Sequence, residues 1–428
     1  MTQLFPPSEE FLQYLWSNRY FDHSTLQTKD GHKLQILQTG IWNRNQGPDF
    51  LQAHIRLDEI DHFGQIELHL YSKDWYLHGH DSDPQYNGTI LHVVFQSDNQ
   101  PIFREDRSKI PELVLEAYVD VTLWQKYDRL RLSEDQLPCH FHLNKVSPDI
   151  KKSYLEALGK ERFQQKVAFF RNKLDALHHD WQQLLYRYTM GMLAGPVNKE
   201  AFEHLADELP YSLMRSYQQE PVKLEALFMG KAGMLDRPND SYGIQLKEEW
   251  DFLQHKHQLD HVLLFPIKLL RMHPSSFPSL RLSQMGKLLS HFPSLVDLLS
   301  PSAWEDFLAI DIQAGAYWND HYRLGEKAAS SAIRRLGQAQ KESILINVIL
   351  PLSYLYLEFH GRRRVWEECI GMLTSLRPEN NRKTRKWKQH GFPNQHALQS
   401  QGIIKLAKEK CAEKRCLECR IGRELIKP

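Results

Sequence analysis

The hydrophobic pattern changes once along the chain, near Pro138, and this change constrains the fold more than any other feature. Between about residue 33 and residue 121, apolar residues occur in short β-branched or alternating runs bounded by Gly, Pro, Asn and Asp, as in β-strands. The expected strands are 33–37, 53–58, 64–71, 89–96 and 113–119. Beyond Pro138 we expect no further strands, because the apolar residues recur at helical spacing. The pattern predicts an α+β protein, with a small mixed-sheet N-terminal domain followed by a larger all-α domain.

Helices are expected on both sides of the sheet. Ser8 as N-cap, with Glu9 and Glu10 in the first turn, predicts an amphipathic helix over 8–20. Later helices are expected at 148–177, 179–193, 198–207, 245–257, 283–291, 302–310, 324–350, 352–375 and 395–412. A chain of 428 residues exceeds what one hydrophobic core commonly serves. We therefore divide it into an α/β domain (1–136), a helical domain (137–376) and a basic C-terminal extension (377–428).

The composition is that of a globular chain, with 41% hydrophobic and 25% charged residues. The nearest approach to a membrane span, 344–357, is interrupted by Asn347, Pro351 and Ser353. Pro6 and Pro7 precede any apolar run that a secretory leader would need. We therefore expect a cytoplasmic protein without membrane contact.

The charge is distributed unevenly along the sequence. From Arg377 onward there are 14 Lys and Arg against 5 Asp and Glu, a local charge of +9, which leaves 40 and 48, or −8, for the remainder. Cations interleaved with an aromatic residue occur at Arg382, Lys383, Arg385, Lys386, Trp387 and Lys388. Such a run suits phosphate contacts and base stacking, which predicts a nucleic-acid partner. A solvated face that only aids solubility explains the charge equally well.

Strand 64–71 places polar side chains on one face of the predicted sheet. Alternation puts Gln65, Glu67 and His69 on one face, and Ile66, Leu68 and Leu70 on the other. Burying three polar groups is costly unless each finds a partner, and a metal ion would be such a partner.

The turn Gly47-Pro48-Asp49-Phe50 supplies a second carboxylate ahead of that strand. Asp49, Glu67 and the carbonyl of Leu68 could provide the oxygen ligands that Mg²⁺ or Mn²⁺ prefers. The ion would activate water and neutralise charge on a phosphodiester, while His69 positions or deprotonates that water or joins the metal shell. Gln65 lies on the same face and is a further candidate.

These residues resemble the motif of the PD-(D/E)XK nuclease superfamily. Pro48-Asp49 and Glu67-Leu68-His69 match its order and strand context over roughly the first 120 residues. The resemblance implies a metal-dependent nuclease, whose N-terminal helix often adds an acid, here Glu10 or Glu9. Two features depart from the motif. His69 stands in place of the usual lysine, and no convincing helix separates the strands at 64–71 and 89–96.

A loop rich in metal-competent side chains follows the strand. Asp74, His78 and His80 occur within a short span after His69, and could bind Zn²⁺ or Mn²⁺ with it. This arrangement suggests a hydrolase of a small substrate as an alternative. Asp74 could equally cap a turn, and His92 is expected to be a satisfied core residue.

Three cysteines close together near the end of the chain suggest a second metal site. Cys411, Cys416 and Cys419 can wrap one metal centre, with Cys139 as the fourth ligand and Cys369 or His396 as less favoured substitutes. Zn²⁺ and an iron–sulfur cluster both fit the spacing. Cys369, within an apolar stretch, is expected to be a core residue. If Cys139 closes the site, the metal would join the C-terminus to the first domain, as an iron–sulfur cluster does in some nucleases of the superfamily named above, although their cysteine spacing differs.

Nearly the whole chain resembles a bacterial family described only as a domain of unknown function. The resemblance rests on Gly47-Pro48-Asp49-Phe50, Glu67-Leu68-His69, Asp74-Trp75, His78-Gly79-His80, Leu91-His92-Val93-Val94, Leu137-Pro138-Cys139 and the terminal cysteines. It implies no activity. The hypotheses are therefore a metal-dependent nuclease of DNA or RNA, a non-catalytic nucleic-acid-binding scaffold with a structural metal, and a Zn²⁺ or Mn²⁺ hydrolase of a small substrate.

Overall fold

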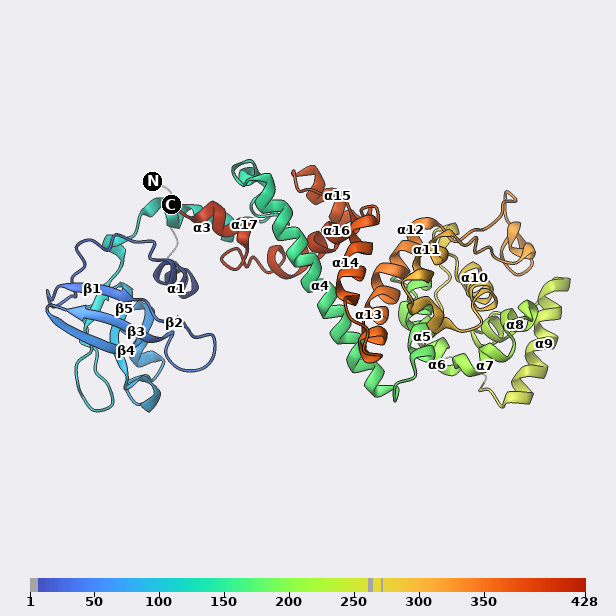
Figure 1. Ribbon diagram of the computed structural model, residues 1–428, viewed down its shortest axis with the longest axis horizontal. Helices are drawn as coiled ribbons and strands as arrows, with labels where there is room; N and C mark the ends of the chain where they lie inside the picture. Colours follow the sequence, from blue (N-terminus) through green and yellow to red (C-terminus); the bar gives the residue numbers. More distant parts are fainter. Residues whose placement is uncertain (1–6, 261–264, 271) are drawn as a thin grey trace. The chain divides into compact units, whose positions relative to one another are not determined.

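The computed structural model describes residues 7–260, 265–270 and 272–428 (Figure 1). The chain forms two compact units. The first comprises the chain up to Tyr154 together with Arg385–Pro393 and Ile404–Pro428, and the second comprises Leu155–Thr384 and Asn394–Ile403. The tail therefore contributes segments to both units.

The first unit is built on a mixed sheet whose strands run in the order β1-β3-β4-β5-β6, with β2 pairing to β3. The strands are β1 (Leu34–Gln38), β2 (Ile41–Trp42), β3 (Phe50–Leu57), β4 (Ile60–Tyr71), β5 (Thr89–Gln96) and β6 (Glu112–Val114). β3 pairs antiparallel with β1 and with β4, whereas β4, β5 and β6 run parallel to one another. The expected small mixed sheet is confirmed.

Helix α1 (Glu9–Asn18) packs against β4, the central strand. Ser8 caps it by accepting a hydrogen bond from the amide of Phe11, and Arg19 ends it in a left-handed conformation. Its apolar face buries Phe11, Leu12, Leu15 and Trp16. The polar side chains of α1 can therefore contact residues at the border between the helix and the sheet.

The connection between the parallel strands β4 and β5 contains only short helical turns, α2 (Asp74–Leu77) and η1 (Pro84–Tyr86). Trp75 and Tyr86 of this connection form a small separate core with Ile102 and Ile110. Both faces of β4 are covered as a result, so Glu67 and His69 are buried just as Ile66 and Leu68 are.

The first unit is completed by α3 (Val121–Arg131), η3 (His140–Lys145), η8 (Leu406–Cys411) and α17 (Arg420–Ile426). Helix α4 (Pro148–Ala176) begins in this unit and continues into the second along the sequence. Helices α15 (Arg382–Gln389) and α16 (Ala397–Lys405) also cross the division.

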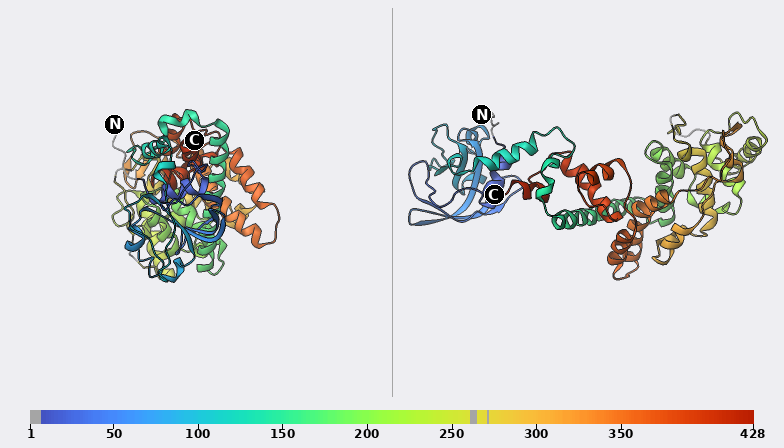
Figure 2. Two further views of the ribbon diagram at one scale, coloured as in Figure 1. Left: turned by 90° about the vertical axis from the view of Figure 1, so that its left-hand side faces the viewer. Right: turned by 90° about the horizontal axis from the view of Figure 1, so that it is seen from above.

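The second unit is largely helical and has one large apolar core (Figure 2). Its helices are α5 (Trp181–Ala194), α6 (Lys199–Glu208), α7 (Tyr211–Ser216), α8 (Pro221–Lys231), α9 (Ser241–His257), α10 (Pro278–His291), α11 (Ser302–Ala309), α12 (Gln338–Ile344), α13 (Leu350–Phe359) and α14 (Val365–Ser375). Short turns η4 (Pro274–Ser276), η5 (Leu295–Leu299), η6 (Ala316–Asn319) and η7 (Leu345–Ile349) connect or extend them. The expected larger helical region is therefore present.

The prediction of a helix over 324–350 is wrong for the first half of that range. Strands β7 (His321–Arg323) and β8 (Glu326–Lys327) form a hairpin here, and the helix begins only at Gln338. Gly325 adopts a φ of +70°, and a Cβ at this position would overlap the side chain of Asn239. Position 325 thus requires glycine both for its positive φ and because a larger side chain would not fit. The expectation that strands end at Pro138 is also wrong.

Gln338–Phe359 is a continuous helical stretch of 22 residues, long and apolar enough by composition to cross a membrane. In its most apolar window the mean hydropathy is 1.3, and 56% of that window is buried inside the structure. Ile344, Leu345, Val348 and Leu352 belong to the core of the second unit. The apolar character is therefore explained by packing within the protein.

Candidate metal centre

The β3–β4 hairpin brings the two predicted carboxylates together. Phe50 pairs with Ile66, which sets Asp49 beside Glu67 at the mouth of the hairpin. The amide of Asp49 donates to Oε2 of Glu67 at 2.9 Å, and the amide of Leu68 donates to Oδ2 of Asp49 at 3.1 Å. An amide and a carbonyl of one strand residue point to the same edge, so the Leu68 carbonyl also lies on the Asp49 side.

Helix α1 supplies a polar contact to this pair that the sequence reasoning missed. Nε2 of Gln13 donates to Oδ1 of Asp49 at 2.7 Å. Glu9 precedes Gln13 by four residues and therefore lies on the same helix face. This i, i+4 pair of polar residues on an amphipathic helix was the available signal.

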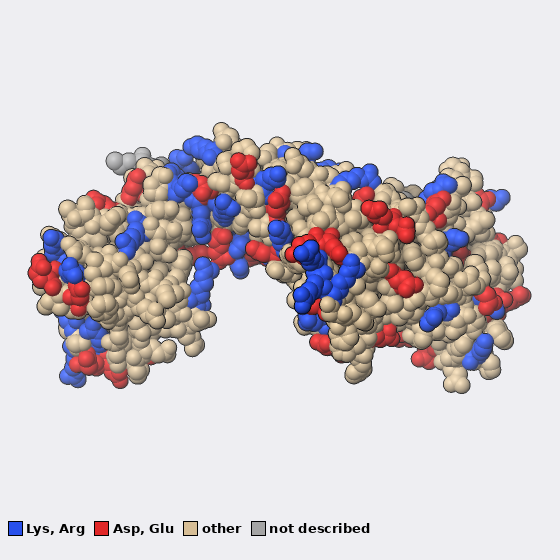
Figure 3. All heavy atoms as spheres, in the orientation of Figure 1, with Lys and Arg blue, Asp and Glu red and all other residues tan. Residues whose placement is uncertain are grey.

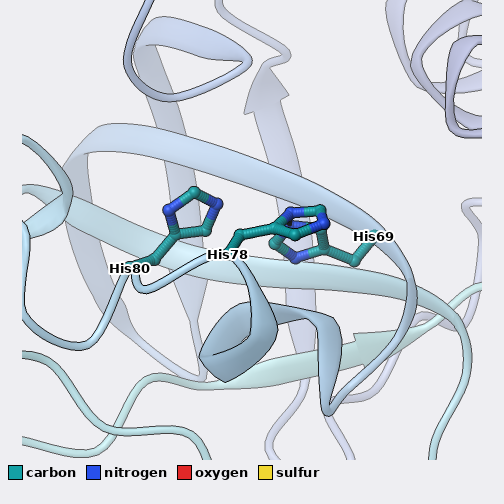
Figure 4. A group of neighbouring side chains, drawn as sticks. All are labelled: His69, His78 and His80. Carbon is teal, nitrogen blue, oxygen red and sulfur yellow. Dashed lines mark hydrogen bonds between the residues drawn. The ribbon is translucent and has the colours of Figure 1, made fainter.

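The second oxygen of Glu67 faces imidazole nitrogens. Oε1 of Glu67 lies 3.4 Å from Nε2 of His80 and 3.6 Å from Nε2 of His69. Nε2 of His69 lies 3.0 Å from Nδ1 of His78. One ring nitrogen from each of the three histidines lies within 4.8 Å of the other two nitrogens. Figure 4 shows the three rings gathered together.

These separations match a shared cation. Two nitrogens about 2.05 Å from a tetrahedral Zn²⁺ lie about 3.3 Å apart. Nε2 of His80 is buried and has no hydrogen-bond partner among the described residues, as expected of a nitrogen that awaits a ligand. Glu67, His69, His78 and His80 are therefore suited to hold one ion.

The connection after β4 positions the two loop histidines. His78 ends α2, and Gly79 turns the chain with a φ of +73° so that His80 reaches back over the strand. The ring of Tyr86 stacks on His80 with centroids 3.7 Å apart, and Trp75 packs edge-on against the same imidazole. Both aromatic rings thus orient a histidine.

A row of polar residues across the parallel strands orients His69. Register places Glu67, His92 and Glu112 side by side on β4, β5 and β6. Nδ1 of His69 lies 2.8 Å from Nε2 of His92, whose Nδ1 lies 3.3 Å from Oε2 of Glu112. Lys29 approaches the other oxygen of Glu112 at 3.5 Å. His92 is thus a satisfied buried residue, as expected, and it also contacts the site.

The protonation states along this row leave a lone pair on His69. Burial alone raises the pKa of Glu112, but hydrogen bonds from His92 and two serines outweigh burial, so its pKa is lowered and it is ionised at neutral pH. Burial lowers the pKa of His92, which is neutral and donates from Nδ1 to Glu112. Nε2 of His92 must then accept from Nδ1 of His69, which leaves the lone pair of His69 on Nε2, where it faces Nδ1 of His78 and can bind a metal.

The site is arranged unfavourably for carboxylates without a cation. Burial, and then the neighbouring Glu67, raises the pKa of Asp49 to about 7. Burial likewise raises the pKa of Glu67 to about 8. Burial and the surrounding imidazoles lower the pKa of His69 to about 2, so this histidine is neutral and carries none of the positive charge of a lysine. A bound cation would supply that charge.

Of the two acids at the start of α1, Glu9 and not Glu10 approaches the site. Burial raises the pKa of Glu9, and His78 is the neighbouring side chain that opposes this rise most strongly. Glu10 instead lines a surface pocket with Arg44, Lys410 and Glu418. The preference for Glu10 is corrected, because the 100° step between successive helix residues turns the two side chains to different sides.

Two further predicted residues have other contacts. Oδ2 of Asp74 accepts from the amide of Tyr71 at 3.0 Å, which is the capping role considered as the alternative. The side-chain amide of Gln65 packs against Gly88. A Cβ added to Gly88 would lie 3.1 Å from Oε1 of Gln65. This Oε1 is buried and has no hydrogen-bond partner among the described residues.

Most side chains of the basic run on α15 are exposed. Arg382, Lys383, Arg385 and Lys388 are open to solvent, while Nζ of Lys386 contacts Gln136 at 3.1 Å. Trp387 is only 3% exposed, so its ring cannot stack on a base as the sequence suggested, because it packs into the interior. On the face drawn in Figure 3, Lys and Arg are intermixed with Asp and Glu.

In fold and site, this is an α+β protein with a candidate metal centre of histidines and carboxylates on a mixed sheet. Residues 9–382 match the model of the family described as "Protein of unknown function (DUF2851)", so the chain belongs to that family. The whole-chain resemblance drawn from the sequence is confirmed. No curated protein and no solved structure matches the chain.

Proposed function

We propose that the protein is a divalent-metal-dependent hydrolase that cleaves phosphodiester bonds in nucleic acid. One observation carries the proposal: Oε1 of Glu67 and nitrogens of three histidines converge, with the carboxyl of Asp49 beside them. Asp49 directly precedes β3 and Glu67 lies on the neighbouring β4, an order that resembles the PD-(D/E)XK motif and supports a phosphodiester as substrate.

The donor set narrows the choice of metal. Mg²⁺ prefers oxygen ligands and keeps several waters, whereas imidazole nitrogens favour Mn²⁺, Zn²⁺ and related ions. Of the Mg²⁺ or Mn²⁺ expected from the sequence, the nitrogen-rich site favours Mn²⁺, with Zn²⁺ as the competing ion. Such an ion, when bound, lowers the pKa of a coordinated water and offsets negative charge on the phosphodiester.

Each side chain then has a distinct role. Glu67, His69, His78 and His80 would hold the ion, with the Leu68 carbonyl at the same edge. Asp49, which lies beside Glu67, would be ionised with the cation bound and is suited to accept a proton from the attacking water. Gln13 holds the Asp49 carboxylate in place through its hydrogen bond to Oδ1. His69 acts as a ligand and not as a replacement for the lysine charge, because it is neutral.

Substrate contact is assigned to the exposed cations of α15. Arg382, Lys383, Arg385 and Lys388 are free to meet phosphates, and Lys386 could add to them. The proposal places the protein in the cytoplasm, where nucleic acid is accessible and thiols stay reduced.

The test is cleavage of single- and double-stranded DNA and RNA by the full chain with Mn²⁺, Zn²⁺ or Mg²⁺. We expect products with Mn²⁺ or Zn²⁺, and none from Glu67→Gln under the same conditions. Cleavage by Glu67→Gln equal to that of the unmodified chain would refute the assignment, as would the absence of products with every ion and substrate.

Two alternatives predict different outcomes of the same experiment. A hydrolase of a small substrate, favoured by the three histidines at one ion, would bind Mn²⁺ or Zn²⁺ through Glu67 and leave nucleic acid intact. A non-catalytic scaffold would bind nucleic acid in a salt-sensitive manner and yield no product with any ion.

A further inference from the structure

Four of the five cysteines lie together in the first unit, away from the histidine site in sequence. Cys139, Cys411, Cys416 and Cys419 are 7–9% exposed, and all are free thiols. Cys139 immediately precedes η3, whereas the other three come from the tail. The fifth, Cys369, belongs to the core of the second unit, as expected.

The tail is shaped to turn its three sulfurs toward one region. Cys411 ends η8, and Lys414 reverses the chain in a left-handed conformation with a φ of +51°. The amide of Cys419 then donates to the carbonyl of Cys416 at 3.2 Å. A Cβ on Gly422 would come within 2.2 Å of that same carbonyl, so only glycine permits this close wrap.

The four thiols are electrostatic neighbours. Burial raises the pKa of Cys139, and the nearby Cys419 and Cys416 raise it further. The pKa of Cys411 is raised by burial and then by the other three thiols. Without a metal, these sulfurs would be protonated, buried and inert. With a metal, they would be thiolates that share its positive charge.

Hydrogen-bond donors surround the sulfurs. The backbone amides of Gly422 and Ile421 and the side chain of Tyr154 approach the sulfur of Cys419. The indole nitrogen of Trp387 lies near Cys411, is buried, and has no other partner among the described residues. N–H groups directed at sulfur stabilise a metal-bound thiolate and tune the centre it holds. The burial of Trp387 thus has a reason that its sequence context did not reveal.

The spacing of the sulfurs disfavours a single tetrahedral ion. Four sulfurs about 2.3 Å from one Zn²⁺ lie about 3.8 Å apart. Among the described residues, no three of these cysteines have sulfurs that all lie within 4.8 Å of one another, whereas the three histidine nitrogens do. Thiolates bound to different irons of a cubane cluster lie further apart than those around a single ion.

We propose that Cys139, Cys411, Cys416 and Cys419 bind a [4Fe–4S] cluster, one cysteine to each iron. The cluster links the tail covalently to the segment that follows α3. It requires neither the histidine site nor the hydrolase activity, so the failure of either proposal leaves the other standing.

The experiment is to purify the full chain without exposure to air from iron-supplemented cells and to measure iron, acid-labile sulfide, zinc and the visible spectrum. We expect brown protein with about four iron and four sulfide per chain. Cys139→Ala should lose most of the iron and sulfide. Cys369→Ala, which removes an equally buried thiol from the other unit, should retain both.

Colourless protein with one equivalent of zinc would overturn the cluster, as would protein with neither metal. Equal cluster content in Cys139→Ala and Cys369→Ala would overturn the assignment of Cys139. If Cys139→Ala does not fold, metal and sulfide in the unmodified chain still decide between cluster, zinc and no metal.

Discussion

Glu67 in the sheet unit and Glu225 in the helical unit are both buried glutamates, 6% and 4% exposed, but their surroundings differ. Glu225 accepts hydrogen bonds from the hydroxyls of Ser283 and Tyr242 and from the indole of Trp318. Among the described residues Glu67 accepts a single amide hydrogen bond, and its other oxygen faces two imidazoles.

This difference in hydrogen-bond partners distinguishes a structural glutamate from a candidate metal ligand. Glu225 is surrounded by O–H and N–H donors, which satisfy a carboxylate at the cost of fixing several side chains. The nitrogen that His69 presents to Glu67 is a lone pair, because its proton lies on the side of His92. A lone pair that faces a buried carboxylate is stabilised only by a shared proton or a cation. The second unit therefore holds a structural glutamate and the first a candidate ligand.

The largest expected effect tests this difference between Glu67 and Glu225 directly. Glu67→Gln should weaken binding of Mn²⁺ or Zn²⁺ by more than about 100-fold, since removing a ligand costs more than removing its supporting partner. Glu225→Gln should leave metal binding unchanged and lower the free energy of unfolding by about 1–3 kcal/mol. Calorimetric metal titration and chemical denaturation of both variants measure the two effects. Equal loss of metal affinity in both would remove the distinction.

The row behind His69 should have the next largest effect. Glu112→Gln replaces the charged acceptor that keeps the proton of His92 on Nδ1 with a neutral and weaker one, so we expect metal affinity to fall about 10–100-fold. Asp61→Asn, which removes an exposed carboxylate from the same strand as Glu67, serves as the control. Unchanged affinity in Glu112→Gln would show that the row is only structural.

The pH dependence of metal binding should reflect carboxyls and not histidines. Glu67 must lose its proton to bind a cation, and the bound cation also favours the ionised form of the neighbouring Asp49; their pKa values are about 8 and 7. Affinity should therefore rise about tenfold per pH unit for each such proton up to about pH 7–8. An ordinary histidine site would level off near pH 6.5. Metal titrations between about pH 5.5 and pH 9 distinguish the two.

The same shift has a consequence for the metal-free protein. The native pKa of Glu67 lies above the ordinary value of 4.5, so the folded chain retains a proton that the unfolded chain releases between these values. The stability contributed by this group is complete below about pH 4.5 and is lost as pH rises toward 8. Saturating metal should remove the loss, and denaturation with and without metal measures it.

The smallest effect concerns the nucleic-acid partner. Lys383→Ala removes one exposed cation, so nucleic-acid affinity should fall a few-fold for all sequences and the salt dependence should weaken by about one unit of slope. Lys327→Ala removes an exposed cation from β8 as a control. Binding titrations at several salt concentrations provide the test, and identical behaviour of both variants would remove α15 from the interface.

Much of the fold could be read from local pattern. The alternating runs predicted β4 and β5 closely, and helical spacing predicted most of the second unit, because these signals are carried by neighbouring residues. The hairpin at Gly325 was missed because its signal is a single glycine within an otherwise helical pattern. In the candidate site, Asp49, Glu67, His69, His78 and His80 were all named in advance because their chemistry is evident at short spacing.

The sequence by itself determined which residues carry chemistry and which strands and helices hold most of them, since side-chain type and hydrophobic period are local properties. Only the tertiary structure decided that Glu9 and Gln13, and not Glu10, approach the site, that Glu112 orients His69 through His92, and that Trp387 lies beside Cys411. These relations depend on strand register, helix rotation and the return of the tail to the first unit. They join residues far apart in the chain, and no local pattern encodes such distances.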